Sequence, residues 1–334
     1  MSTGPVGSDD DTRERSGAPP REEGMAVAAV AIDFLLVGVA VVALWVGGLR
    51  FVESASTLAR RLGVSDLVIG LTVVGFGTSL PEIAVTLDAA VVGRADIAVA
   101  NVIGSNIVNL GFVLGGVALL GPVVASRTLV RRDGTVVVAS AVLCGLVCRD
   151  LTVTRVEGAL LVAAFLGYML AVVRGDEPGE TVAAAVETVT VRLVLTAAVG
   201  LALIVLGANL LVGSAADLAR VAGLSEWVIG ETIVAVGTST PEFVASLVAA
   251  RRGLGDVAAG NLLGSCVFNA LGILGLAGLL VPLTVAAAAA TSVLWLIGLC
   301  VLVIALFATG GELSRGEGVP LVLVAVAKWI VDLV

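Results

Sequence analysis

Two glutamates, Glu82 and Glu242, are the side chains in this sequence that most clearly require a partner. Each lies within a long apolar stretch that contains no Lys or Arg. An ionised side chain at the centre of a membrane-spanning helix costs about 2.5–3.5 kcal/mol on insertion scales, so such groups are usually paired and functional. A bound cation would supply the positive charge that the neighbouring sequence lacks. We therefore interpret both glutamates as cation ligands.

Both glutamates end the same six-residue motif. The motif Gly-Thr-Ser-x-Pro-Glu occupies residues 77–82 and again residues 237–242. Its proline lacks an N–H group and clashes with the carbonyl four residues earlier, which predicts an interrupted helix. The interruption frees backbone carbonyls around Thr78 and Thr238, and irregular backbone inside a membrane persists only where protein or water satisfies it. The threonine and glutamate of each motif are four residues apart and therefore share a helix face.

The segment after each motif adds further oxygen atoms. It carries a serine and an asparagine four residues apart, Ser105 and Asn109 in the first copy and Ser265 and Asn269 in the second. The combined set of carboxylate, hydroxyl, amide and carbonyl oxygens suits hard cations such as Ca²⁺ and Na⁺. The chain has no histidine, and its four cysteines lie in apolar runs, where they are interpreted as small buried hydrophobic residues.

The two motifs belong to a longer internal repeat. Residues 64–122 align without a gap to residues 224–282, at an offset of 160 residues. The Gly-Thr-Ser-x-Pro-Glu motif, an Asn-x-x-Gly-Ser motif and a final proline all stay in register. A fixed offset over this length indicates a duplicated structural unit.

Composition places these repeats in a membrane. The chain of 334 residues is 58% hydrophobic and 14% charged, whereas a soluble domain has about a quarter of its residues charged. Segments long enough to span a bilayer are predicted at 26–47, 66–91, 97–121, 134–148, 155–174, 191–213, 226–250, 257–281, 286–308 and 319–334. The expected fold is an all-α membrane protein of about ten transmembrane helices, with broken helices at the midplane. Five spans per half is an odd number, so the second half enters from the opposite side and the repeats are inverted.

The predicted organisation has four parts. They are a disordered acidic tail (1–24), a first repeat (25–174), a cytoplasmic linker (175–190) and a second repeat (191–334). Arginine is more frequent in the loops on the linker's side, which predicts a cytoplasmic linker and extracellular termini. We expect a multi-pass protein of the cell membrane. The sequence leaves its oligomeric state open, and a monomer could suffice.

The paired motifs resemble the α-repeats of the cation/calcium exchanger superfamily, specifically the prokaryotic sodium/calcium exchangers. This resemblance implies a ten-helix fold that exports Ca²⁺ against inflowing Na⁺ by alternating access. Carried over residue by residue, it implies as ion ligands Thr78, Ser79, Glu82, Ser105, Asn109, Thr238, Ser239, Glu242, Ser265 and Asn269. Several relatives have aspartate where this chain has Asn269, which leaves ion stoichiometry and potassium dependence open.

Other functions were weighed against Na⁺/Ca²⁺ exchange. The alternatives are a Ca²⁺/H⁺ or other cation antiporter, including a K⁺-dependent one, and more remotely a cation channel. An enzyme is disfavoured because no nucleophile–base pair or cofactor motif is present, and nucleic-acid binding is disfavoured because basic patches are absent. Three further acidic residues are also interpreted: Asp96 and Asp256 as helix caps, and Glu231 as a candidate for the ion access path.

Overall fold

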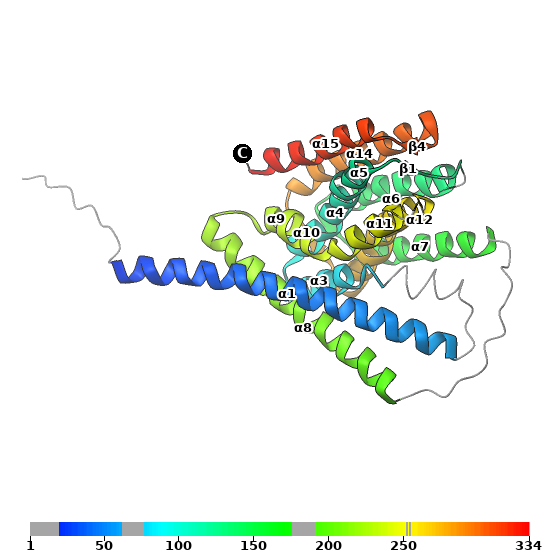
Figure 1. Ribbon diagram of the computed structural model, residues 1–334. Coiled ribbons are helices and arrows are strands. Elements are labelled where there is room, and N and C mark those ends of the chain that lie inside the picture. The colour runs from blue at the N-terminus through cyan, green and yellow to red at the C-terminus, as the bar shows by residue number, and fades with distance from the viewer. Residues whose placement is uncertain are drawn as a thin grey trace, which may run out of the picture.

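A computed structural model describes residues 20–61, 77–127, 129–175, 191–251, 253 and 255–333, and this part of the chain is almost entirely helical (Figure 1). The first half contains α1 (Pro20–Arg61), α3 (Leu80–Val91), α4 (Ala95–Ile107), the π-helical η2 (Val108–Leu114), α5 (Gly115–Leu120), η3 (Leu129–Asp133), α6 (Gly134–Val147) and α7 (Arg155–Gly175). The second half contains α8 (Val191–Ala222), α9 (Glu226–Ile229), the π-helical η4 (Gly230–Val234), α10 (Ala235–Thr238), α11 (Thr240–Arg251), α12 (Gly255–Val267), η5 (Phe268–Ile273), α13 (Leu274–Leu280), α14 (Ala288–Gly310) and α15 (Arg315–Leu333).

Helices occupy most of the described part of each of the ten predicted segments, and their ends differ from the predicted bounds by a few residues. Residues 66–76 of the second segment and residue 334 of the tenth lie outside the described residues. At the N-terminus the structure differs from the prediction. Residues 20–24, predicted to belong to a disordered tail, form the first turns of α1. The remainder of that tail (1–19) and linker residues 176–190 lie outside the described residues.

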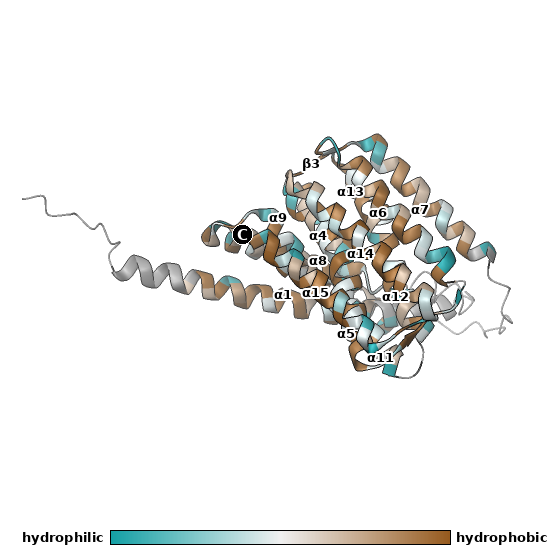
Figure 2. Cartoon of the chain, turned by 90° about the horizontal axis from the view of Figure 1, so that it is seen from above, coloured by the Kyte–Doolittle hydropathy of each residue, from teal (hydrophilic) through white to brown (hydrophobic). Residues whose placement is uncertain are grey.

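Several of these helices have the length and composition to cross a membrane. Within the described residues, six qualify: Val30–Phe51, Ala95–Leu120, Arg155–Val172, Val191–Ala222, Gly255–Leu280 and Ala288–Gly310. A bent pair, Glu226–Thr238 with Thr240–Arg251, would make a seventh span. Hydrophobic residues also run along the outer helices, for example α7 and α15 (Figure 2), where large apolar side chains are exposed. The chain is therefore an all-α membrane protein.

Two long helical rods form the centre of the molecule. In the span Ala95–Leu120, made of α4, η2 and α5, 83% of the most apolar 18-residue stretch is buried inside the protein. The same share is buried in Gly255–Leu280, made of α12, η5 and α13. In α1 and α8, only 22% of the most apolar 18-residue stretch is buried. The serine–asparagine pairs predicted to bind a cation lie on the two central rods.

Helices α1 and α8 cross each other beside this centre (Figure 1). At the crossing, a Cβ atom added to Gly47 would lie 2.8 Å from the carbonyl oxygen of Gly200, and one added to Gly200 would lie 2.8 Å from that of Gly47. Small residues that allow two backbones to approach are a common means of helix association in membranes. The long N-terminal helices of the two halves are thus packed directly on one another.

The two halves are related by the same offset as the sequence repeat. Strand β1 (Val123–Val124) pairs antiparallel with β4 (Glu312–Leu313), and β2 (Thr152–Val153) pairs with β3 (Leu283–Thr284). Adding 160 to the number of the first-half residue in each sheet gives the second-half residue of the other sheet: Val123 becomes Leu283, and Val153 becomes Leu313. Each half therefore contributes one strand to each two-stranded sheet.

Asp96 and Asp256 also join the halves, which corrects their interpretation as helix caps. The carboxylate of Asp96 accepts a hydrogen bond of 2.6 Å from the N–H of Ala286, and that of Asp256 accepts one of 2.5 Å from the N–H of Ser126. Both lie in the first turn of their helices, but neither is the residue that caps it. Each binds a loop of the opposite half at the repeat offset.

Candidate cation site

The backbone of both glutamate motifs departs from a continuous helix. In the second half, α10 ends at Thr238 and α11 begins at Thr240, with a bend of 46° between the two segments. In the first half, residues 77–79 form a turn and α3 begins at Leu80. The predicted interruption is observed at the position that the proline dictates. It places each glutamate in the first turn of a helix, where the helix dipole favours a negative charge.

The two motifs exchange hydrogen bonds. The Ser79 hydroxyl donates to Oε1 of Glu242 at 2.8 Å, and the Ser239 hydroxyl donates to Oε1 of Glu82 at 3.2 Å. These four residues are between 0% and 1% exposed. Two motifs 160 residues apart in the sequence therefore form one buried site, in which each serine holds the carboxylate of the other half.

The predicted serines of the central rods join this site. The hydroxyl oxygens of Ser265 and Ser79 are 3.2 Å apart, and those of Ser105 and Thr238 are 3.3 Å apart. Thr238 in turn donates to Oδ1 of Asn101 at 3.1 Å. Three hydroxyls from α4, α10 and α12 thus meet the glutamate motifs.

Asn101 was not among the predicted site residues, although it was visible in the sequence. It is the asparagine of the first Asn-x-x-Gly-Ser motif, and its equivalent in the second is Asn261. The amide of Asn101 donates to the Thr86 hydroxyl at 3.0 Å, and that of Asn261 donates to the Ser246 hydroxyl at 3.0 Å. Donating its N–H to Thr86 leaves the carbonyl oxygen of Asn101 to receive the Thr238 hydroxyl. The repetition of this asparagine was the signal for its role.

Asn269 has its amide orientation set by a neighbour. Its Nδ2 donates to Oδ1 of Asn106 at 3.1 Å, and Nδ2 of Asn106 donates to the carbonyl oxygen of Cys266 at 3.0 Å. The amide nitrogen of Asn269 is therefore hydrogen-bonded within the protein, and its amide oxygen is left to bind another partner. The repeat gave no signal for Asn106, because its equivalent in the second half is Cys266.

Buried polar atoms without a hydrogen-bond partner gather on the predicted ligands. Among the described residues they include Thr78 Oγ1, Glu82 Oε2, both amide atoms of Asn109, Glu242 Oε2 and Asn269 Oδ1. Leaving a buried polar group unsatisfied costs about 1–3 kcal/mol, and more when it is charged. Oxygens from carboxylates, hydroxyls and amides are the ligands that Ca²⁺ takes. The described residues contain no cluster of three or more His, Cys, Asp or Glu side chains able to hold a metal ion, so two carboxylates and neutral oxygens define this site. The four cysteines are free and buried, as expected.

Comparison with known proteins identifies the family of the chain. A family model described as "Sodium/calcium exchanger protein" matches residues 32–174 and 192–328, one range in each half. The chain belongs to the sodium/calcium exchanger family. It is accordingly a transporter of the cation/Ca²⁺ antiporter class, a family of exchangers and not of enzymes.

The similarity to individual proteins covers most of the chain. MaX1, a sodium/calcium exchanger of Methanosarcina acetivorans, is 34% identical over 347 residues, covering 90% of this chain and 99% of MaX1. CaxA of Alkalimonas amylolytica is 39% identical over 270 residues, covering 78% of this chain and 84% of CaxA. A solved structure of the sodium-calcium exchanger NCX_Mj superposes with a TM-score of 0.62 at 29% identity, covering 89% of this chain and 98% of that one.

Proposed function

We propose that this exchanger moves Ca²⁺ in one direction and Na⁺ in the other by alternating access. The observation that carries the proposal is the pair of crossed hydrogen bonds, Ser79 to Glu242 and Ser239 to Glu82, beside unpaired carboxylate and amide oxygens. Na⁺ and Ca²⁺ are both hard cations that prefer such oxygens. The names of MaX1 and NCX_Mj, both sodium/calcium exchangers, favour the same pair of ions.

All ten predicted ligands are assigned to this site in the proposal. Ser79, Ser239 and the two glutamates would form its centre, with Ser105 and Ser265 on either side. Thr78, Thr238, Asn109 and Asn269 would complete the oxygen shell with hydroxyl or amide oxygens. Because each glutamate is held by a serine of the opposite half, a relative movement of the halves would change the ligand set as a unit.

Charge determines how the ions compete. Two ionised glutamates neutralise one Ca²⁺ or two Na⁺, so the two cargoes exclude each other at short range. We propose that a third Na⁺ binds through hydroxyl and carbonyl oxygens, which gives exchange of three Na⁺ for one Ca²⁺. Asn269 supplies an amide oxygen to the site but adds no negative charge.

We further propose ten spans arranged as two inverted five-helix repeats with broken helices at the midplane. Support comes from contacts that recur at the repeat offset, such as the two strand pairs and the two aspartate–loop contacts. In this arrangement both termini are extracellular, the linker is cytoplasmic and the protein lies in the cell membrane.

The deciding experiment is uptake of ⁴⁵Ca²⁺ into proteoliposomes that contain the purified exchanger. Na⁺-loaded vesicles diluted into Na⁺-free buffer should accumulate Ca²⁺, whereas vesicles loaded with K⁺ or with choline should not. Uptake driven by an outward proton gradient without Na⁺ would instead establish Ca²⁺/H⁺ exchange. Uptake that required K⁺ together with Na⁺ would establish the K⁺-dependent alternative. Rapid downhill flux without any counter-ion would identify a channel.

A further inference from the structure

A second group of buried charges lies outside the cation site. The ammonium of Lys328 on α15 donates a hydrogen bond of 2.9 Å to Oε2 of Glu231 on η4 and also pairs with Asp332. Lys328 and Glu231 are both 0% exposed. Charged side chains this deeply buried are rare unless they are paired, and inside a membrane protein they mark functional positions by default.

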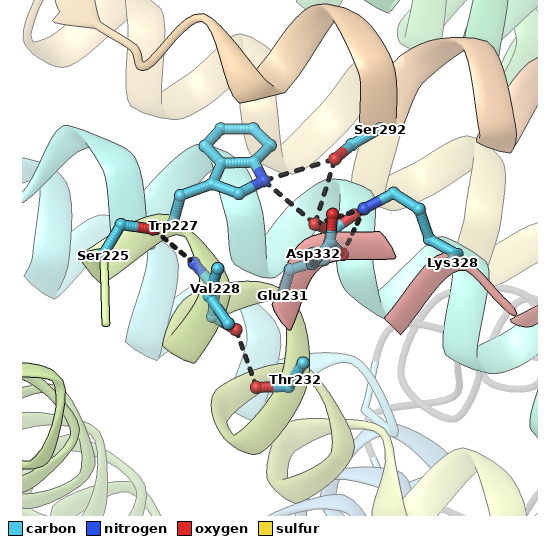
Figure 3. A network of polar contacts seen from close by, with 8 residues as sticks. All are labelled: Ser225, Trp227, Val228, Glu231, Thr232, Ser292, Lys328 and Asp332. Carbon is cyan, nitrogen blue, oxygen red and sulfur yellow. Dashed lines mark hydrogen bonds and ion pairs between the residues drawn. The ribbon is translucent and has the colours of Figure 1, made fainter. Parts of the chain in front are cut away.

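A single oxygen of Glu231 accepts hydrogen bonds from side chains on three other helices (Figure 3). Besides Lys328, Oε2 accepts hydrogen bonds from Trp227 Nε1 at 2.9 Å and from the Ser292 hydroxyl at 3.0 Å. Trp227 lies on α9, Ser292 on α14 and Lys328 on α15. Glu231 was interpreted from the sequence as a candidate for the ion access path, but its carboxylate is bound to these neighbouring helices.

The backbone of Glu231 lies against the cation site's central rod. A Cβ atom added to Gly104 would come within 2.7 Å of both the Cα and the carbonyl oxygen of Glu231. Gly104 immediately precedes Ser105, one of the predicted ligands. Glu231 is therefore held on one side by the helix that carries Ser105 and on the other by Lys328.

Glu231 also shares a helical run with another predicted ligand. The run passes through η4 and α10 from Glu231 to Thr238, and seven residues of helix span about 10 Å. Thr238 is the last residue before the bend. The η4 segment is π-helical, and such departures from a regular helix often accompany function. Because Thr238 is the last residue of this run, its position depends on how the run is anchored.

The lysine–glutamate pair is not repeated in the sequence of the first half. At the repeat offset, Glu231 and Lys328 correspond to Leu71 and Tyr168. The hydroxyl of Tyr168 donates to Oδ1 of Asp133 at 2.9 Å, which connects α7 to η3. The first-half equivalents therefore cannot form a lysine–glutamate pair between the last helix and the ligand-bearing segment.

We propose that the Glu231–Lys328 ion pair is a positioning element of the exchanger, which fixes Thr238 and the helix bend through α15. This inference rests on the proposed function, because its effect is read out as cation affinity. The pair acts through the η4–α10 run and does not itself bind the transported ion.

The test compares four variants with wild type in proteoliposomes, after each has been shown to be monodisperse. Glu231→Gln leaves Lys328 paired with Asp332 alone and breaks the link to η4, and Lys328→Met leaves the carboxylates of Glu231 and Asp332 without their cation. In both variants the half-saturating Ca²⁺ concentration should rise at least fivefold with a smaller change in maximal rate. The exchange of charges in Glu231→Lys with Lys328→Glu, made in an Asp332→Asn background so that the new glutamate does not face a second carboxylate, keeps an ion pair and should return that concentration to within twofold of wild type. Tyr168→Phe, the matched control at the equivalent position, should leave it unchanged.

A double variant, Glu231→Leu with Lys328→Leu, again in the Asp332→Asn background, removes the charges of this group and leaves none unpaired. It should fold and still show the raised half-saturating concentration, which decides the question if the single variants aggregate. Ca²⁺-dependent thermal stabilisation in detergent provides a second measure of affinity that does not require transport. Wild-type half-saturation in the folded variants, or failure of both double variants to fold, would overturn the proposal. Absence of Na⁺-driven uptake by the wild type, with Ca²⁺-dependent stabilisation still altered in the variants, would overturn the proposed function alone.

Discussion

Ser79 donates a hydrogen bond of 2.8 Å to the carboxylate of Glu242, which lies 163 residues further along the chain. Its counterpart, Ser239 to Glu82, completes a crossed arrangement. The carboxylate of each half therefore takes its orientation from a hydroxyl of the other half. A cation site of this kind exists only when both halves are docked, and the predictions below follow from that dependence.

Glu82→Gln and Glu242→Gln should each lower the rate of Ca²⁺ uptake by at least about 100-fold. Each change preserves the shape of the side chain but removes one of two buried negative charges, and short-range charge interactions away from bulk water are worth several kcal/mol. Asp217→Asn is the matched control, because Asp217 forms an exposed pair with Arg220. Wild-type uptake by either glutamine variant, shown to be folded, would exclude that glutamate as a ligand.

Ser79→Ala and Ser239→Ala should each raise the half-saturating Ca²⁺ concentration by at least about tenfold. A hydrogen bond to a charged group contributes about 1.5–3 kcal/mol, and 1.4 kcal/mol corresponds to a factor of ten. Ser140→Ala serves as control, since this buried hydroxyl donates to the carbonyl of Val137 on its own helix. Equal effects of all three substitutions would argue against the crossed arrangement.

Asn101→Ala should weaken Ca²⁺ binding more than Asn261→Ala. Both asparagines bond a hydroxyl of the preceding helix, but Asn101 also accepts a hydrogen bond from the predicted ligand Thr238. The loss of one neutral hydrogen bond, about 0.5–1.5 kcal/mol, predicts an increase of about 2- to 12-fold in half-saturating concentration for Asn101→Ala. The reverse order of the two variants would contradict this assignment.

Exchange of three Na⁺ for one Ca²⁺ should respond to membrane voltage. When vesicles take up one Ca²⁺ and release three Na⁺, one positive charge leaves, so an inside-positive potential should accelerate uptake and an inside-negative one should slow it. A single charge crossing the membrane corresponds to about 2.3 kcal/mol per 100 mV. Potentials set with K⁺ gradients and valinomycin provide the measurement, and uptake that ignores them would support two Na⁺ per Ca²⁺.

The membrane orientation can be tested by labelling single cysteines in a variant from which the four native cysteines have been removed. A cysteine replacing Glu180 in the linker should react with a membrane-impermeant reagent only after cells are opened. One replacing Arg149, an exposed residue between α6 and α7, should react in intact cells. Labelling of position 180 from outside would reverse the proposed topology.

The sequence predicted the fold well because its strongest signals are periodic. Apolar segments located helices in both halves, and the repeat offset anticipated that the two glutamate motifs would be equivalent. The positions of the helix breaks followed from single prolines, whose missing N–H acts locally. By contrast, α1 extends from Pro20 to Arg61, beyond the apolar stretch at 26–47, because polar residues continue the helix past its hydrophobic part.

Contacts between distant parts of the chain were not predictable in the same way. Asp96 has the position of a helix cap in the sequence, but its partner is the N–H of Ala286. Glu231 and Lys328 are separated by 97 residues, and neither has a charged equivalent in the first half, so the repeat gave no indication that they meet. Asn106 escaped notice for the same reason. Local rules describe helices, whereas these contacts depend on how the helices are packed.

The two-stranded sheets have a consequence for how the protein is made. Strand β1 emerges early during synthesis, but its partner β4 follows only after about 190 further residues. At about 5–20 residues per second, the ribosome needs roughly 10–40 s to supply that partner. Until then, the backbone N–H and C=O groups of β1 lack their strand partner while the first half is already in the membrane. A chain arrested before residue 312 should therefore be a preferred substrate for membrane quality-control proteases.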